Sequence, residues 1–369
     1  MRVIVTGGGT GGHIYPAMAV AGGLLARHSD IEVLYVGTKD GMEAKIVPDN
    51  GLEFKGISGK GMPRKLSMET MRTAGANVMA LWETKQILKK FKPDLVVGTG
   101  GYVSGPVVLT SALFGIPTLL HEQNALPGKT NKFLAKLVKN IMLAFPESAQ
   151  YFPAKGKIKV VGLPVREEIG RIERKTGAAE FGLNPVRKTL LVTGGSRGAL
   201  SINKAMVYVL SKLIEHTDIQ VIWGTGTATY NIIIDELDRS RVDWHCDQWK
   251  IMEYIKNMPE ALACSDLCIC RAGATTLAEL SAAGKAGILI PYPYAAENHQ
   301  EYNARAFANK QAAQVILDKD LNGLLLWEAI QRILFNTFVL EEMSARSKQI
   351  FNPGALDRIV NLCLHTAWR

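Results

Sequence analysis

Two copies of one pattern, about half a chain apart, constrain the fold more than any other feature of this sequence. Residues 3–14 read VIVTGGGTGGHI, and residues 190–201 read LLVTGGSRGALS. Each copy is an apolar strand, a glycine-rich turn and the start of a helix. Within a chain of 369 residues, such an echo predicts two domains that begin with the same device.

Short apolar runs alternate with longer helical patterns along the whole chain. They include RVIVT, EVLYVG, DLVVG, IPTLLH and NIMLAF, and later TLLVTG, IQVIWG, SDLCICR and GILIPYP. Runs that are apolar throughout belong to strands buried on both faces. The predicted fold class is therefore α/β, with parallel sheets covered by helices. We place one domain over 1–163 and a second over 164–338, and we expect helices over 339–369 that can pack back on the first domain.

The positive charge lies entirely in the first half of the chain. Residues 1–163 hold 20 Lys and Arg against 11 Asp and Glu, whereas residues 164–369 hold 23 of each. This asymmetry indicates an anionic partner of the first domain, such as a phosphorylated substrate, an acidic lipid surface or nucleic acid. A solvated basic face with no partner is the alternative. Few aromatic residues interleave with the basic ones, which argues against RNA binding.

Cysteine usage and hydropathy indicate a cytoplasmic protein without metal or disulfide sites. The five cysteines form no C-x-x-C pair, and Cys268 and Cys270 are expected to pack on one side of a strand. No apolar run approaches the roughly 18 residues of a membrane-spanning helix. The N-terminus enters a strand directly, without the features of a signal peptide.

The first glycine loop predicts an anion site. Gly7, Gly9 and Gly12 match G-x-G-x-x-G between a strand and a helix, where backbone N–H groups and the helix terminus can bind phosphate. A dinucleotide site would also need an acidic residue at the end of the second strand, but that strand ends VGTK. The second loop, Gly194–Gly198, adds a hydroxyl and a guanidinium. We therefore expect two phosphorylated ligands that face each other across a cleft.

Polar residues follow several other predicted strands. In CRAGATTLAE (270–279), Thr275 and Thr276 begin a helix, and Glu279 can either bind a ribose diol or stabilise the helix dipole. The loop PYPYAAENHQEYNA (291–304) offers amides that suit sugar hydroxyls or helix caps. In the first half, GTGGYVSGP and HEQNALPG supply further candidates at the carboxyl edge of the sheet: Tyr102, Ser104, His121, Glu122 and Asn124.

His13 lies at the start of the first helix. The helix dipole lowers the pKa of a histidine at this position, so a neutral ring could act as a general base. Packing or capping is the competing interpretation. Two acidic stretches, Asp318–Asp320 and GTKDGME (37–43), are interpreted as a polar turn and a solvated loop and not as metal sites.

Taken together, six motifs resemble one family. TGGGTGGHIYP, GTGGYVSGP, HEQN, GGSRGA, CRAGATTLAE and PYPYAAENHQEYNA occur in the order found in the MurG family of glycosyltransferase family 28. The resemblance implies a GT-B fold, with two Rossmann-like domains whose parallel sheets face each other across a cleft. It implies inverting transfer of GlcNAc from UDP-GlcNAc to the MurNAc C4 hydroxyl of lipid I in peptidoglycan synthesis, without a cofactor or metal. It also implies a peripheral enzyme on the cytoplasmic face of the membrane.

The resemblance further assigns residues. Those implied to bind substrate are Thr10, Gly11, Gly12, Asn124, Arg166, Ser196, Ile255, Ala274, Thr275, Thr276, Glu279 and Gln300. His13 is the candidate general base. Arg197 and His299 stand where relatives carry glutamine, which affects the expected contacts there.

Membrane docking and two rival activities complete the expectations. The mixed apolar and basic segment 77–92 suits a membrane interface, although its apolar spacing also suits a core-facing helix. The main rival is an enzyme similar to UDP-GlcNAc 2-epimerases, which would need no lipid-facing surface. A nicotinamide-dependent oxidoreductase is disfavoured by the missing ribose-binding acid.

Overall fold

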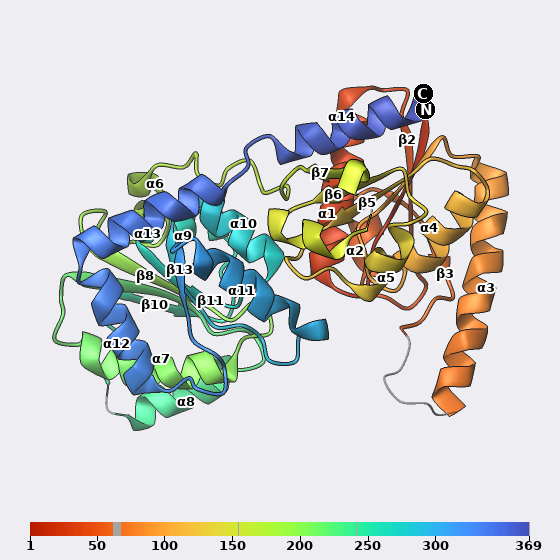
Figure 1. Cartoon of the computed structure of the whole chain (residues 1–369). Coiled ribbons are helices and arrows are strands. Elements are labelled where there is room, and N and C mark those ends of the chain that lie inside the picture. Colours follow the sequence, from red (N-terminus) through yellow and green to blue (C-terminus); the bar gives the residue numbers. More distant parts are fainter. Residues whose placement is uncertain (62–67, 154, 241, 369) are drawn as a thin grey trace. The chain divides into compact units, whose positions relative to one another are not determined.

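The computed structural model describes residues 1–61, 68–153, 155–240 and 242–368. The chain divides into two compact units, which are Met1–Pro164 with Asn352–Arg369 (unit 1) and Val165–Phe351 (unit 2). Each unit contains one parallel sheet covered by helices (Figure 1). The predicted α/β class, with parallel sheets, is confirmed.

Unit 1 is built on seven parallel strands in the order β3-β2-β1-β4-β5-β6-β7. The strands are β1 (Arg2–Thr6), β2 (Glu32–Thr38), β3 (Glu53–Ile57), β4 (Leu95–Gly98), β5 (Thr118–Glu122), β6 (Asn140–Leu143) and β7 (Ile158–Val160). The helices are α1 (Gly11–Arg27), α2 (Glu43–Asp49), α3 (Met68–Phe91), α4 (Ser104–Leu113), α5 (Lys129–Leu134) and α14 (Ala355–Ala367), with 3-10 turns η1 (Pro146–Tyr151) and η2 (Lys155–Lys157). Strand order reverses between β1 and β4, which places the loops after these two strands where ligands of open α/β sheets bind.

Alternate residues of β1 serve two cores. Val3 and Val5 pack with α1 and α14 on one face of the sheet, and Ile4 packs with α3, α4 and α5 on the other. This arrangement explains why β1 is apolar at every inner position. Helix α14 lies along α1 so closely that a Cβ on Gly23 would be 2.9 Å from Leu356 Cδ1.

Unit 2 repeats the plan with six parallel strands in the order β10-β9-β8-β11-β12-β13. The strands are β8 (Lys188–Thr193), β9 (Ile219–Gly224), β10 (Trp249–Met252), β11 (Leu267–Cys270), β12 (Ala286–Leu289) and β13 (Ala313–Val315). The helices are α6 (Arg174–Glu180), α7 (Leu200–Leu213), α8 (Tyr230–Arg239), α9 (Met258–Cys264), α10 (Ala274–Ala283), α11 (His299–Asn309), α12 (Gly323–Leu334) and α13 (Thr337–Ile350), with the 3-10 turn η3 (Ala296–Asn298). Cys268 and Cys270 are both buried, as expected for one packed side of a strand.

The C-terminal stretch 339–369 is shared between the units. Helix α13 contacts α10, α12 and β12 and belongs to unit 2. Helix α14 contacts α1 and β4 and belongs to unit 1. The chain therefore passes between the units twice, at 164–165 and at 351–352.

Candidate functional site

A cavity of about 200 Å³ opens at the carboxyl ends of three strands of unit 2. Thr193 ends β8, Gly224 ends β9 and Cys270 ends β11, and all three line it. Five residues assigned from the sequence also line it: Arg166, Ser196, Ile255, Thr276 and Glu279. Residues up to 113 positions apart in the chain thus meet at one sheet edge, where this class of fold binds ligands.

Glu279 forms an ion pair with Arg166 in this cavity. Arg166 Nε and Nη2 donate to the same oxygen, Oε1 of Glu279, at 3.1 and 2.8 Å. Burial raises the pKa of Glu279, and the guanidinium of Arg166 opposes that rise. Glu279 lies in the second turn of α10, beyond the first turn in which a dipole interaction is strongest. The helix dipole therefore contributes little at this position, and the charge of Glu279 is paired with Arg166 instead.

Thr276 lines the cavity, and Ala274 and Thr275 precede it in the first turn of α10. Gly273 caps α10 without a side chain, so the first N–H groups of Ala274, Thr275 and Thr276 have no intrahelical acceptor. Ile255 is buried, and its side chain would meet a Cβ on Gly224 at 3.0 Å. A larger residue at position 224 would therefore displace Ile255.

Gln300 connects two loops at the same sheet edge. Its Oε1 accepts from the backbone N–H of Ala272 at 3.2 Å and of Tyr292 at 2.9 Å. The side-chain oxygen is thus a structural acceptor, and its amide nitrogen is the donor that it can offer a ligand. His299 directs Nδ1 to the carbonyl of Ala296 within its own turn.

The second glycine loop is shaped by backbone packing. Gly198 has φ +83°, and a Cβ there would lie 2.1 Å from the carbonyl oxygen of Thr225. Its neighbours Ser196 and Arg197 are exposed. Gly198 is therefore required by the fit between two loops, while Ser196 lines the cavity.

In unit 1 the first glycine loop leads into α1. Thr10 is the N-cap residue but makes no side-chain cap bond, and its hydroxyl is exposed. The backbone N–H groups of His13 and Ile14 donate to Thr10 O, whereas Gly11 and Gly12 occupy the first turn. Donors in a first turn have no intrahelical acceptor, so this end of α1 can receive an anion.

Two oxygen atoms hold the imidazole ring of His13 at its Nδ1 atom. Its Nδ1 lies 3.0 Å from the backbone oxygen of Thr99 and 3.0 Å from Oε1 of Gln123. The half-buried ring also packs against Gly100, where a Cβ would lie 3.0 Å from Cε1 and Nδ1. Because both facing atoms accept hydrogen bonds, Nδ1 carries the proton in the neutral ring and Nε2 carries the lone pair.

Three of the polar residues expected at this edge are enclosed by protein. Ser104, His121 and Glu122 are buried and satisfied internally, so the expectation that they face a ligand is wrong. Glu122 accepts from the backbone N–H and side-chain nitrogen of Asn124, and also from Gly128 and Asn131. This buried carboxylate therefore shapes the loop that carries Asn124.

The interpretation of GTKDGME as a solvated loop holds for Lys39, Asp40 and Met42, which are exposed, but it is wrong for Glu43. Glu43, its last residue, is fully buried. Its Oε1 accepts from the N–H and hydroxyl of Thr38, and its Oε2 accepts from Gly9 N–H at 3.2 Å. Gly8 passes so close that a Cβ would lie 2.4 Å from Oε1. Glu43 is thus an anchor of the first glycine loop.

Several residues of both sites carried no assignment from the sequence. Glu253 and Tyr254 line the cavity of unit 2, and Arg271 lines it while bonding Ser201 and pairing with Asp318. Asp318 therefore neutralises the charge of Arg271. Arg271 lies in CRAGATTLAE and Gln123 lies in HEQN, so these motifs indicate where the two residues are but not what they do. Within the described residues, no group of three acidic, His or Cys side chains is arranged to hold a metal ion.

Helix α3 has two different faces. Ala80, Thr84 and Leu88 are buried in the core. Val78, Met79 and Trp82 are exposed, Trp82 by 58%, and Lys85 lies over the ring of the exposed Phe114. The core-facing interpretation of segment 77–92 is therefore confirmed for one face of the helix, and the other face exposes apolar and basic side chains. Across the described ranges, no single helix has the length and hydropathy of a membrane span, and only a pair bent by 87°, 323–334 with 337–367, passes together.

Comparisons with known proteins agree with this layout. Residues 3–143 match the Glycosyltransferase family 28 N-terminal domain, and residues 189–359 match the family 28 C-terminal domain. A protein of Desulfitobacterium hafniense (strain Y51) is 60% identical over 369 residues, covering 100% of both chains. It is named UDP-N-acetylglucosamine--N-acetylmuramyl-(pentapeptide) pyrophosphoryl-undecaprenol N-acetylglucosamine transferase.

Solved structures show the same architecture. The crystal structure of Acinetobacter baumannii MurG is 28% identical, with a TM-score of 0.80 and 99% of each chain covered. The UDP-GlcNAc 2-epimerase of Neisseria meningitidis bound to UDP-GlcNAc has a TM-score of 0.67, covering 99% of this chain and 100% of that one. At 15% identity, the second likeness concerns the fold alone.

Proposed function

This chain belongs to glycosyltransferase family 28, and we propose that it moves GlcNAc from UDP-GlcNAc to the MurNAc C4 hydroxyl of lipid I, giving lipid II and UDP. The observation that carries the proposal is 60% identity, over the full length, to a protein named for this transfer. The GT-B class implied by the sequence resemblance is confirmed by the similarity to MurG. The product is a building block of peptidoglycan.

We assign the donor to unit 2. UDP occupies the cavity at the ends of β8, β9 and β11, with uracil against the backbone of Ile255. The first turn of α10, from Ala274 to Thr276, faces the diphosphate together with Ser196. Gln300 donates its amide N–H to the sugar. The support for this assignment is that helix N-termini and loop amides bind phosphate well.

In this proposal, Arg166 and Glu279 exchange each other for groups of UDP-GlcNAc when that substrate binds. Glu279 accepts hydrogen bonds from the two ribose hydroxyls, which releases the guanidinium to the diphosphate. A carboxylate enclosed without a cation would be costly, so Arg166 opposes the rise in the pKa of Glu279 that burial causes while the cavity is empty. The same guanidinium then stabilises the charge that develops on departing UDP.

We assign acceptor activation to unit 1. His13 Nε2 takes the proton of the C4 hydroxyl as the oxygen attacks the anomeric carbon from the side opposite UDP, which inverts the configuration. Thr10, Gly11 and Gly12 lie directly before this base and contact the sugars and the acceptor diphosphate. Asn124, held by Glu122, contacts the GlcNAc. The bonds of His13 to Thr99 and Gln123 support the assignment of the base.

We also propose that unit 1 docks on the cytoplasmic face of the membrane. The docking face comprises the exposed side chains of α3 and of the end of α4: Val78, Met79, Trp82, Lys85, Lys89, Leu113 and Phe114. Apolar tips among lysines suit the boundary between acyl chains and anionic headgroups. A lipid-linked acceptor makes such docking necessary. Nucleic acid has no part in the reaction.

One experiment separates the transferase from the epimerase. The purified chain is incubated with labelled UDP-GlcNAc, with and without a lipid I analogue in vesicles of anionic phospholipid. Transfer of label to the analogue, only when it is present, supports the proposal. Formation of UDP-ManNAc without acceptor would refute it. His13→Ala should bind UDP-GlcNAc normally and lose at least about 100-fold in kcat, the usual contribution of a general base.

A second experiment tests docking. Trp82→Glu should weaken co-sedimentation with anionic vesicles and leave binding of UDP-GlcNAc unchanged. Glu83→Gln is no suitable control because Glu83 bonds Lys39 and Ser58. Lys45→Glu, an exposed position on helix α2 outside the proposed docking face, is a better one. Equal vesicle binding by wild type and Trp82→Glu would argue against this docking face.

A further inference from the structure

A buried chain of hydrogen bonds runs beneath His13. Gln123 Oε1 lies 3.0 Å from His13 Nδ1. Gln123 Nε2 lies 2.9 Å from the backbone oxygen of His121 and 3.1 Å from its Nδ1. His121 Nε2 lies 3.0 Å from the backbone oxygen of Gly162. Each of these groups except His13 is fully enclosed in unit 1.

Every proton in this hydrogen-bond network can be assigned, because its backbone carbonyl oxygens can only accept hydrogen bonds. The Gly162 carbonyl cannot donate, so His121 carries its proton on Nε2 and presents a lone pair at Nδ1. Burial lowers the pKa of His121 to about 4, which keeps the ring neutral near pH 7. The carbonyl of His121 likewise accepts only. The nitrogen of the Gln123 amide must therefore face His121, and its oxygen must face His13.

We propose that Gln123 is a positioning residue, which holds the imidazole of His13 with Nδ1 protonated and Nε2 free to accept a proton. This inference rests on the proposed function, in which His13 is the base. Two oxygens share the Nδ1 proton: Thr99 O restrains one side of the ring, and Gln123 Oε1 restrains the other. Both carry partial negative charge, so they stabilise the imidazolium that forms when Nε2 takes a proton.

The surroundings of the ring agree with this role. Gly100 and Gly101 have φ values of +103° and +80°, which favour glycine. A Cβ on Gly101 would lie 3.3 Å from His13 Cδ2 and 2.3 Å from the carbonyl oxygen of Gly8. Backbone thus flanks the half-buried ring, and Gln123 is the one side chain among its hydrogen-bond partners in the described residues.

The first test reads the tautomers directly. Full-length protein with ¹⁵N-labelled histidine is examined by long-range ¹H–¹⁵N correlation at pH 7.5, with His13→Ala and His121→Asn used for assignment. We expect the Nδ1–H form at His13 and the Nε2–H form at His121. The opposite form at either ring would overturn the proposal. This readout does not depend on activity, so it remains decisive even if the chain transfers no sugar.

The second test separates positioning from a general structural role. Gln123→Met removes both amide contacts while keeping the side-chain length. We expect kcat about 10-fold lower, the loss of roughly one hydrogen bond in the transition state, and KM for UDP-GlcNAc within about twofold of wild type. An unchanged kcat would overturn the proposal.

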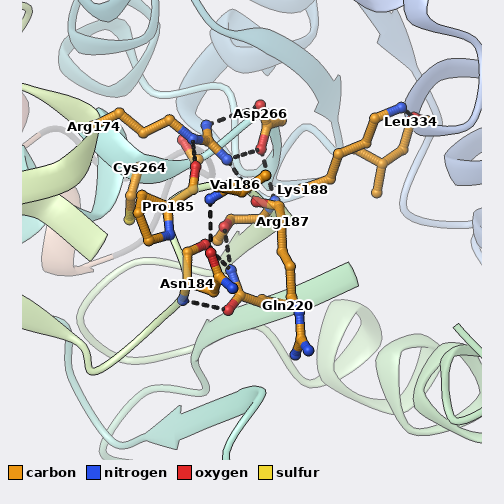
Figure 2. Close-up of polar contacts among 12 residues, drawn as sticks. Arg174, Asn184, Pro185, Val186, Arg187, Lys188, Gln220, Cys264, Asp266 and Leu334 are labelled. Atoms are coloured by element: carbon orange, nitrogen blue, oxygen red, sulfur yellow. Dashed lines mark hydrogen bonds and ion pairs between the residues drawn. The ribbon is translucent and has the colours of Figure 1, made fainter. Parts of the chain in front are cut away.

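Gln220→Met is the matched control. Gln220 is also buried, but in unit 2, where its amide holds the backbone of Asn184 (Figure 2). Its Nε2 also donates to Thr189 Oγ1, and none of these three residues lines the cavity. This variant should lose stability and keep its kcat. If the two variants lower kcat alike, Gln123 is merely structural and the proposal is wrong. If Gln123→Met does not fold, the tautomers of wild type still decide.

Discussion

Replacing Glu43 by Gln should loosen the first glycine loop. Glu43 is fully buried and its described contacts are all hydrogen-bond donors: Thr38 N–H at 3.0 Å, the Thr38 hydroxyl and Gly9 N–H. A glutamine has the same shape but only one oxygen. Because Oε1 faces two donors, that oxygen will stay there and the new NH₂ group will face Gly9 N–H.

The expected cost follows from these contacts. Losing a charge-assisted bond to Gly9 costs about 1.5–3 kcal/mol, and two donors are then left opposed. The two bonds to Thr38 persist but weaken as the charge is removed. Relief from burying a charge offsets part of this loss. We therefore expect a net destabilisation of about 3 kcal/mol, concentrated at residues 7–13.

Hydrogen exchange measures this change locally. A loss of about 3 kcal/mol should raise exchange of the Gly9 amide by roughly 100-fold, because each 1.4 kcal/mol is a factor of ten. Since His13 follows this loop, kcat should fall as well. Glu53→Gln, on the exposed part of β3, is the control and should behave as wild type. Exchange at Gly9 that does not differ between Glu43→Gln and wild type would refute the reasoning.

Three further outcomes are expected. The pKa of His121 in the folded protein is about 4, below the usual 6.5, so the unfolded chain binds more protons between these two pH values. The free energy of unfolding should therefore fall by about 3 kcal/mol from pH 6.5 to pH 4. Urea titrations should show this fall in wild type and a smaller one in His121→Asn. Glu279→Gln should raise the dissociation constant of UDP-GlcNAc about 10- to 100-fold in calorimetry, and retention of affinity in this variant would count against ribose binding. Because burial raises the pKa of Glu279, binding of UDP-GlcNAc by wild type should begin to weaken at a higher pH than the pKa of an ordinary carboxylate would predict. Ile359→Ala, fully buried in α14, should cost about 3 kcal/mol in denaturant and leave UDP binding intact; a neutral result would contradict the packing of α14 on α1.

The strands that the sequence did and did not predict differ in one physical respect. The nine apolar runs correspond to inner strands, which neighbours and helices bury on both faces. The four strands without such runs are β3, β7, β10 and β13, and each is an edge of its sheet. An edge strand is partly solvated, as the exposed and half-buried residues of EFKGI in β3 show. Polar residues are therefore tolerated there, and the continuous apolar signal is lost.

The sites were predictable where the pattern is local. A glycine loop between a strand and a helix is contiguous, so its place at a sheet edge follows from sequence. The roles of Glu43 and Gln123 depend on partners 34 and 110 residues away. The residue types of Glu43 and Gln123 do not indicate which distant atoms they contact. Glu43 follows a strand closely, and an acidic residue at such a position is typical of a solvent-exposed loop. His121 was misjudged for the same reason, because its acceptor at Gly162 lies 41 residues further on.

The return of α14 to unit 1 reverses the usual order of events during synthesis. Residues 1–164 leave the ribosome first, but the side of α1 that faces Leu356 and Val360 stays uncovered until the last helix has been made. Residues 165–351 are contiguous and can complete their own core earlier. Unit 1, most of which is translated first, therefore completes its core last. Until then, its nascent form exposes an apolar face of α1 that chaperones can recognise.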